Sequence, residues 1–212
     1  MNRLVTLGLI ALALGLAISA CNTETDNDPP EDNDFLVSFE ADGVQKLYED
    51  GANNYGNGPG INSYPDSVGR LHSQFTTFIR SAFDPDYEND ILTIQMVKFF
   101  ADSDQVSYGT TFLMFDEGTY EYGSWNEDST FLGIDGAVIT YTDNTGKVWS
   151  SDQLYGVQES WASFEITDHR AVDDFQFGAK TKGTFDCRVF DGLGEHVDLR
   201  NGTFHARTIF QE

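Results

Sequence analysis

The chain has 212 residues, of which 12 are Lys or Arg and 35 are Asp or Glu, so its formal net charge at pH 7 is −23. Such an acidic protein repels phosphate backbones, and no nucleic acid is expected among its partners. High net charge is also typical of disordered chains, but 14% aromatic residues, including 17 Phe, predict that most of the chain folds.

The N-terminus has the pattern of a signal peptide. Arg3 precedes an uncharged run of 17 residues, Leu4 to Ala20, which ends in small residues before Cys21. Ile18-Ser19-Ala20-Cys21 resembles the lipobox of bacterial lipoproteins, in which the cysteine is acylated and becomes the first mature residue. That resemblance implies lipidation of Cys21, contact with a membrane through the lipid, and a place in the cell envelope. An ordinary secretory cut and a retained membrane helix are the alternatives.

Three parts are expected: a signal peptide at 1–20, an acidic tether at 21–34 and a single all-β domain at 35–212. Residues Asn22 to Asp34 include no large apolar side chain, so nothing offsets the entropy of ordering them. Acids close behind a lipidated cysteine resemble the surface-export signal of Bacteroidetes lipoproteins, but here Thr25 and Asn27 separate them. The expected address is the outer membrane, with the domain facing either the periplasm or the outside.

Beyond residue 34, apolar and polar residues alternate with the period of β-strands, and no window of eleven residues has a helical period. Short strands at regular spacing predict an antiparallel β-sandwich, with a closed β-barrel as the alternative. The expected strands lie near residues 35–39, 44–48, 72–83, 91–100, 109–115, 118–122, 131–141, 147–149, 160–167 and 183–189.

The C-terminal region has two interpretations. Asn201-Gly202 forms a second hairpin turn, or Glu195 to Phe210 is one long strand with a bulge there. The second is favoured, because residues 175–190 offer a partner strand of matching length. Cys187 shares a face with Phe185 and Val189, which predicts a buried thiol; if Cys21 is lipidated, Cys187 has no disulfide partner.

The segment Asp50 to Arg70 is expected to be a long loop, because it holds five Gly, four Asn and two Pro. Loops of this length are often functional, so Tyr55 and Tyr64 within it are candidate ligand-binding residues. Tryptophan and tyrosine rings elsewhere are candidates for a sugar-binding platform, against the alternative that they belong to the core. These rings are Trp125, Trp149, Trp161, Tyr120 and Tyr122.

Four carboxylates alternate along one predicted turn, and oxygen ligands in such an arrangement suit Ca²⁺. They are Asp84, Asp86, Glu88 and Asp90. The helix-loop-helix calcium pattern is excluded, because it requires Gly at its sixth position and Glu at its twelfth, where this chain has Asn89 and Gln95. A solvated acidic turn is the alternative, and no other cofactor is expected.

No catalytic residue can be assigned, because the chain has no H-E-x-x-H, no G-x-S-x-G and no glycine-rich phosphate loop. The four histidines lack the spacing of metal ligands. His196 and His205 would approach each other only if Asn201-Gly202 were a turn.

Gly183-Thr184-Phe185, Val189 to Gly194 and Val197 to Phe204 resemble the closing hairpin of small β-domain lipoproteins of unknown function in Bacteroidetes. Phe39 to Gly43 and Gly118 to Tyr120 fit the same pattern. The resemblance implies a fold class and an envelope address, but no chemistry.

The sequence thus predicts a membrane-anchored lipoprotein with a β-sandwich that serves as a binding or structural module. Glycans or envelope proteins are the expected partners. A glycan-active hydrolase with its site in Asp50 to Arg70 and a Ca²⁺-dependent adhesion module are the alternatives, and the sequence does not decide whether the protein is an enzyme.

Overall fold

The structure is a computed structural model that describes residues 35–49, 55–65, 71–81, 89–100, 112–124, 134–171 and 178–209. For residues 55–65 and 71–81, and for Phe100, Thr208 and Ile209, it describes the backbone alone. All described residues belong to the second of the two compact units of the chain, Asn33–Glu212. The predictions for Cys21 and the tether, and those for Asp84, Asp86 and Glu88, lie outside the described residues.

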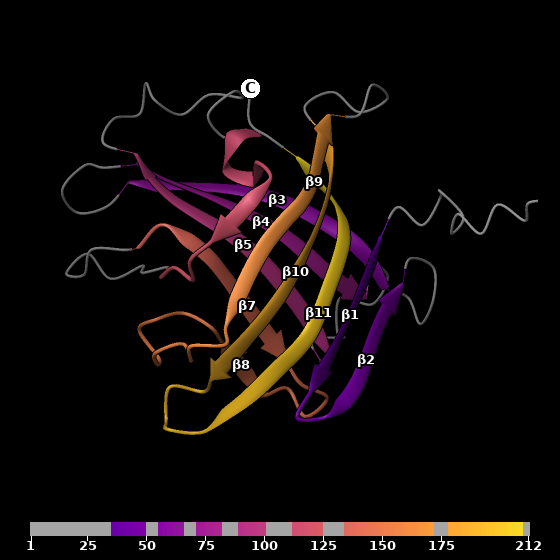
Figure 1. Cartoon of the computed structure of the whole chain (residues 1–212), viewed down its shortest axis with the longest axis vertical. Helices are drawn as coiled ribbons and strands as arrows, with labels where there is room; N and C mark the ends of the chain where they lie inside the picture. The colour runs from indigo at the N-terminus through magenta and orange to yellow at the C-terminus, as the bar shows by residue number, and fades with distance from the viewer. Residues whose placement is uncertain are drawn as a thin grey trace, which may run out of the picture. The chain divides into compact units, whose positions relative to one another are not determined.

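The described strands form one antiparallel sheet, as shown in Figure 1. Its hydrogen-bonded path runs through β2 (Val44–Glu49), β1 (Leu36–Ala41), β11 (His196–Ile209), β10 (Gly178–Phe190), β8 (Val148–Ser150), β7 (Gly136–Thr142), β5 (Ile91–Phe100), β4 (Leu71–Ser81) and β3 (Tyr55–Pro65). A branch adds β9 (Ser163–Ala171) beside β10, and β6 (Gly118–Tyr120) beside β9. A short 3-10 turn, η2 (Leu113–Phe115), precedes β6.

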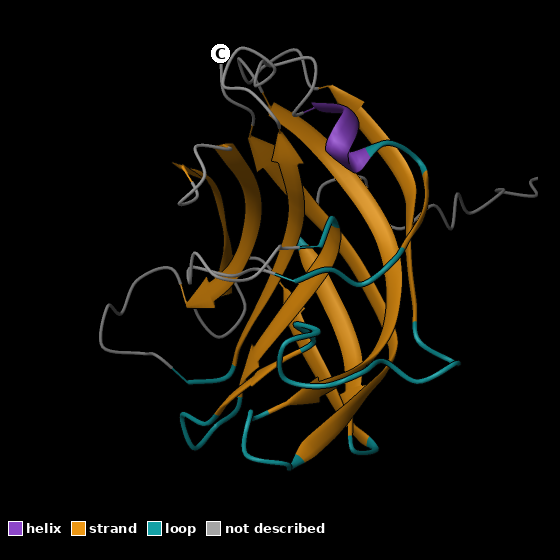
Figure 2. Cartoon of the chain, turned by 90° about the vertical axis from the view of Figure 1, so that its left-hand side faces the viewer, coloured by secondary structure: helices purple, strands orange, loops and turns teal. Residues whose placement is uncertain are grey.

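The sheet curls (Figure 2), and β11 contacts β3 and β4, which lie at the far end of the path. The path nevertheless ends at β2 and β3, which do not pair with each other in the described part, so the sheet is not closed into a barrel. The prediction of an all-β sandwich is confirmed. Its core is made by the inward side chains of alternating strand positions, among them Phe35, Val37, Phe39, Leu92, Ile94, Ile139, Phe164, Ile166, Phe185, Val189 and Leu199.

The C-terminal hairpin has the favoured arrangement. Strand β11 runs without interruption from His196 to Ile209, and its register against β10 shifts between Leu199 and Gly202. Asn201 has a φ of 53°, the left-handed conformation of a bulge residue, so Asn201-Gly202 bulges rather than turns the chain. Cys187 is fully buried on β10 beside Phe185, as predicted.

Strand β10 is where the sheet forks. On the side away from β11, Ala179 to Asp186 pair with β9, whereas Phe190 pairs with Ser150 of β8. Among the described strands, the β10 residues between these two stretches therefore pair with β11 alone. The segment that connects β8 to β9 covers this opening, and it contributes to the candidate site.

Two local predictions were wrong. Tyr55–Pro65, expected to be a loop, is strand β3, because it pairs along its whole length with β4. β3 lies at an end of the sheet, where a proline such as Pro59 is tolerated better than in an inner strand. The expected strand at 109–115 is also wrong over its described residues, because Leu113–Phe115 forms the turn η2 with Met114 and Phe115 buried in the core.

Candidate binding surface at the end loops

Four large apolar side chains lie exposed on two neighbouring loops, and we call them the end-loop surface. Leu154, Tyr155 and Val157 lie on the β8–β9 connection and are 42%, 56% and 84% exposed; Leu193, in the β10–β11 turn, is 91% exposed. The two loops touch, because a Cβ on Gly192 would lie 3.0 Å from Cδ1 of Tyr155. Clustered apolar exposure of this kind is typical of interaction sites.

The β10–β11 turn is held in place by the carboxylate of Asp191. Its Oδ1 accepts hydrogen bonds from the backbone N–H groups of Leu193 at 2.8 Å and Glu195 at 3.0 Å. Lys147 Nζ donates to Asp191 Oδ2 at 2.8 Å and also pairs with Glu195. The Lys147 bond, together with the two backbone bonds, holds the pKa of Asp191 at about 2. Leu193 is therefore presented to solvent by a rigid turn.

The same lysine joins this turn to the β7–β8 hairpin. Lys147 Nζ lies 4.1 Å from the ring centre of Trp149, a cation–π contact. Trp149 Nε1 in turn donates to Asp143 Oδ2 at 3.0 Å, and Asp143 Oδ1 accepts from Thr145. Burial opposes the charge of Asp143, but its hydrogen bonds from Thr145, Trp149 and the Lys147 backbone outweigh that effect and lower its pKa to about 2.

The β8–β9 connection is fixed by a buried carboxylate. Asp152 is 4% exposed, and its Oδ1 accepts from Ser124 Oγ at 2.8 Å and from the backbone N–H of Leu154 at 2.8 Å. Its carbonyl oxygen accepts from the backbone N–H of Tyr155 at 2.9 Å. These hydrogen bonds satisfy the buried side chain and tie it to the loop backbone, so this loop has a defined conformation.

Gln158 takes the place of a missing strand at the fork of the sheet. Its Oε1 accepts from the backbone N–H of Arg188 at 2.9 Å, and its Nε2 donates to the Arg188 carbonyl at 2.7 Å. A side-chain amide thus satisfies both backbone groups of a β10 residue that pairs with one strand only. This pairing fastens the loop to the sheet beside Val157.

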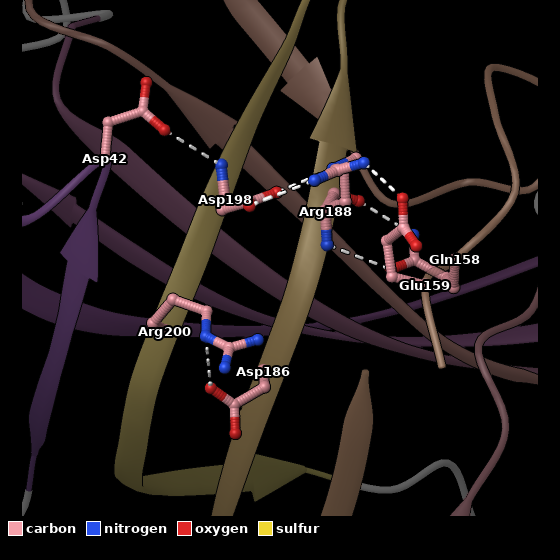
Figure 3. A network of polar contacts seen from close by, with 7 residues as sticks. All are labelled: Asp42, Gln158, Glu159, Asp186, Arg188, Asp198 and Arg200. Atoms are coloured by element: carbon pink, nitrogen blue, oxygen red, sulfur yellow. Dashed lines mark hydrogen bonds and ion pairs between the residues drawn. The ribbon is translucent and has the colours of Figure 1, made fainter. Parts of the chain in front are cut away.

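Arg188 extends the attachment to the outer face of the sheet (Figure 3). Its guanidinium donates to both carboxylate oxygens of Asp198, at 2.7 Å and 3.1 Å, and pairs with Glu159 of the loop. The Asp198 backbone N–H donates to Asp42 Oδ1 at 3.1 Å. A planar guanidinium suits such two-point recognition, and the Arg188 bond lowers the pKa of Asp198.

A second arginine, Arg200 of β11, packs over a tryptophan ring. The guanidinium carbon of Arg200 is 3.8 Å from the ring centre of Trp161. Arg200 Nε is 3.6 Å from Asp186 Oδ1, a pair drawn in Figure 3. Asp186 Oδ1 also accepts from the backbone N–H of Asn201 in the bulge at 2.9 Å. Because Arg200 stacks on Trp161, that ring is a packing surface for an arginine and not an open platform for a sugar.

The end-loop surface has an acidic rim. The side chains of Glu195 and Glu159 are 72% and 45% exposed, although each also pairs with a cation of the networks above. In a chain with a net charge of −23, this rim favours a partner with basic groups around an apolar centre.

The site residues predicted from the sequence do not belong to the end-loop surface. Tyr55 and Tyr64 lie in β3 opposite Ser81 and His72, and their side chains are outside the described part. Of the four calcium candidates Asp90 alone is described, and its Oδ1 accepts from Lys46 Nζ and Tyr48 OH, both at 2.9 Å. Among the described residues, no group of three or more potential metal ligands is found.

Most of the predicted aromatic platform is not available for a ligand. Trp149 and Tyr122 are 7% and 4% exposed and belong to the core, and Trp161 lies under Arg200. Trp125 lies outside the described residues. His196 and His205 are on one continuous strand, so no turn brings them together. The end-loop surface was missed, and the signal for it was the presence of large apolar residues inside two turn segments.

No family model matches the sequence, and neither a curated protein nor a solved structure matches the chain. In the described part of the chain, no helix has the length and apolar character needed to cross a membrane. The inference of function therefore rests on the residues of this chain alone.

Proposed function

We propose that the protein is an envelope lipoprotein, acylated at Cys21, whose β-sandwich binds another envelope protein through the end-loop surface. The observation that carries the proposal is the exposure of Leu154, Tyr155, Val157 and Leu193, at 42% to 91%, on loops that polar groups hold in place. Burying one such side chain is worth about 1.5–3 kcal/mol, and a rigid loop loses little entropy on binding.

A protein partner fits this surface better than a glycan. Three of its four side chains are aliphatic, whereas sugar rings stack on flat aromatic faces, and Tyr155 is the one ring in the set. The acidic rim of Glu195 and Glu159 adds a charge preference. The expected partner surface is an apolar patch bordered by Lys or Arg, and the complex should weaken as salt screens the rim.

Site-specific photo-crosslinking in whole cells tests the binding surface. A photoreactive phenylalanine analogue at position 157 or 193 should give one discrete protein adduct, and adding Val157→Asp to the position-193 probe should abolish it. The same analogue at positions 44 and 47 on β2, where Val44 and Leu47 are 62% and 54% exposed, is the matched control. Equal adducts from the loops and from β2, or none from the loops, would contradict the proposal.

The two cysteines allow a matched test of the anchor. Cys21→Ser should move the protein from the membrane fraction to the soluble fraction without unfolding the domain. Cys187→Ala removes a thiol that is fully buried in the core, so it should lower the stability but leave the protein with the membrane. If the Cys21→Ser variant is processed and still sediments with membranes, acylation is not what anchors the chain.

A further inference from the structure

A groove of about 320 Å³ opens on the far side of β6 from β9, between β5, η2, β6 and the start of β7. Its described lining includes Met96, Val97, Leu113, Met114 and Tyr120, which form an apolar floor and wall. The volume lies at the lower end of the range of small-molecule sites. If each non-hydrogen atom occupies about as much volume as a water molecule in the liquid, the groove has room for about ten of them.

The apolar part of the groove is well supported. Met96 and Met114, 2% and 3% exposed, belong to the core and close the bottom of the groove, whereas Leu113 is 55% exposed. The wall contributed by η2 is held from behind, because the ring of Phe112 lies 4.3 Å from that of His169 on β9. His169 Nδ1 is itself 2.9 Å from Thr181 Oγ1 of β10. The groove is thus built on the sheet.

The rim of the groove is charged, with acids in excess. Glu121 and Asp135 both line it, and they come from neighbouring segments, because the N–H of Ala137 donates to the Glu121 carbonyl at 2.9 Å. Gly136 allows this approach, since a Cβ there would lie 2.3 Å from that carbonyl oxygen. Lys98 contributes one positive charge against these two carboxylates.

We propose that this groove binds a small amphipathic cation, an amine joined to a short hydrocarbon chain or ring. The hydrocarbon part lies against Leu113, above the buried methionines, and the ammonium group faces Glu121, Asp135 and the ring of Tyr120. Tyrosine attracts a cation by its ring face as well as by neighbouring charge. The net charge of −23 further raises the local concentration of cations and lowers that of anions.

The groove is separate from the end-loop surface, and neither proposal depends on the other. Three ligands of equal chain length separate the charge classes: octylamine, octanol and octanoate. Isothermal titration of the full-length Cys21→Ser chain should show octylamine binding about tenfold more tightly than octanol, with octanoate weaker than both. Equal binding of the three, or tightest binding of octanoate, would overturn the proposal.

Two variants assign the binding to the groove. Glu121→Gln combined with Asp135→Asn should reduce the octylamine preference over octanol to about twofold or less. Asn retains the oxygen that accepts from the Phe99 N–H at 2.9 Å, so the fold is preserved. Leu113→Lys places a positive charge at the wall and should weaken octylamine about tenfold, while Leu47→Lys, at a side chain of matching exposure, 54% against 55%, should not. Octylamine affinity that is unchanged by both groove variants would show that the amine binds elsewhere.

Discussion

The end-loop surface and the edge strand β2 both expose large apolar side chains, but they differ in how those side chains are held. Val44 and Leu47 of β2 are 62% and 54% exposed on a regular strand at an end of the sheet. Leu154 and Leu193 lie on irregular loops whose backbones are fixed by the carboxylates of Asp152 and Asp191. In the end loops, buried or paired carboxylates fix the backbone from which the apolar side chains extend into solvent. That arrangement, more than exposure alone, indicates a binding surface.

The largest expected effect follows from removing the anchor of the β8–β9 connection. Asp152→Ala leaves the hydroxyl of Ser124 and the N–H of Leu154 without their acceptor, and should lower the free energy of unfolding by about 2–3 kcal/mol. Urea unfolding at pH 7 measures it. Ser38→Ala removes an exposed hydrogen bond to Thr203 and should cost less than about 0.5 kcal/mol. Equal effects of the two changes would mean that Asp152 does not anchor the loop.

A smaller loss is expected at the outer network. Arg188→Met retains much of the side-chain packing but removes the pairs with Asp198 and Glu159, and should cost about 1–2 kcal/mol. Arg170→Met is the control, because Arg170 is 61% exposed and its Nε lies 3.8 Å from Asp168 Oδ2, a longer separation than either Arg188–Asp198 bond. Its cost should stay below about 0.5 kcal/mol in the same urea experiment. If the two arginines prove equivalent, the network does not stabilise the loop.

The turn carboxylates predict an acid-sensitive end of the molecule. Asp143 and Asp191 have pKa values of about 2 in the folded protein, below the value of about 3.9 in an unfolded chain. Their contribution is complete above about pH 4 and is lost as the pH falls from about 4 to 2. Melting temperatures should drop over this interval, and the drop should be shallower in an Asp143→Asn, Asp191→Asn double variant. An unchanged slope in that variant would assign the acid sensitivity to other groups.

The smallest effect on stability is expected where the effect on binding is greatest. Leu193→Asp changes a side chain that is 91% exposed, so the free energy of unfolding should change by less than about 0.5 kcal/mol. Leu47→Asp on β2 should be equally mild. The first variant, and not the second, should abolish the adduct of the probe at position 157.

Much of the fold could be predicted from local patterns. The β5 bounds were predicted directly, and the long β11 with its bulge followed from the length match across the Gly192 turn. Strand β3 was missed because its glycines and asparagines have low strand propensity, and only its pairing with β4, a long-range feature, makes it a strand. The turn η2 was missed because Met114 and Phe115 are buried by contacts that alternation does not reveal.

The candidate site could not be predicted from local sequence patterns, because it too depends on contacts between distant parts of the chain. Leu154 and Val157 lie between the expected strands 147–149 and 160–167, and their exposure depends on the fork in β10 and on the Gln158 amide that fills it. Trp161 and Trp149 looked like ligand-binding rings, but Arg200 and Lys147 cover them with cation–π contacts from distant parts of the chain. Which aromatic or aliphatic group meets solvent is decided by tertiary packing.

Amide hydrogen exchange of the free protein tests the central claim most directly, because the claim is that the end loops are ordered before any partner binds. The amides of Leu154, Tyr155, Leu193 and Glu195 donate to Asp152 or Asp191. They should exchange at least about tenfold more slowly than in an unstructured chain. Asp152→Ala removes the carboxylate to which the Leu154 N–H donates but keeps the carbonyl that accepts from Tyr155, so it should speed exchange at Leu154 and leave Leu193 and Glu195 protected. Exchange of all four at the unstructured rate would contradict a preformed binding surface.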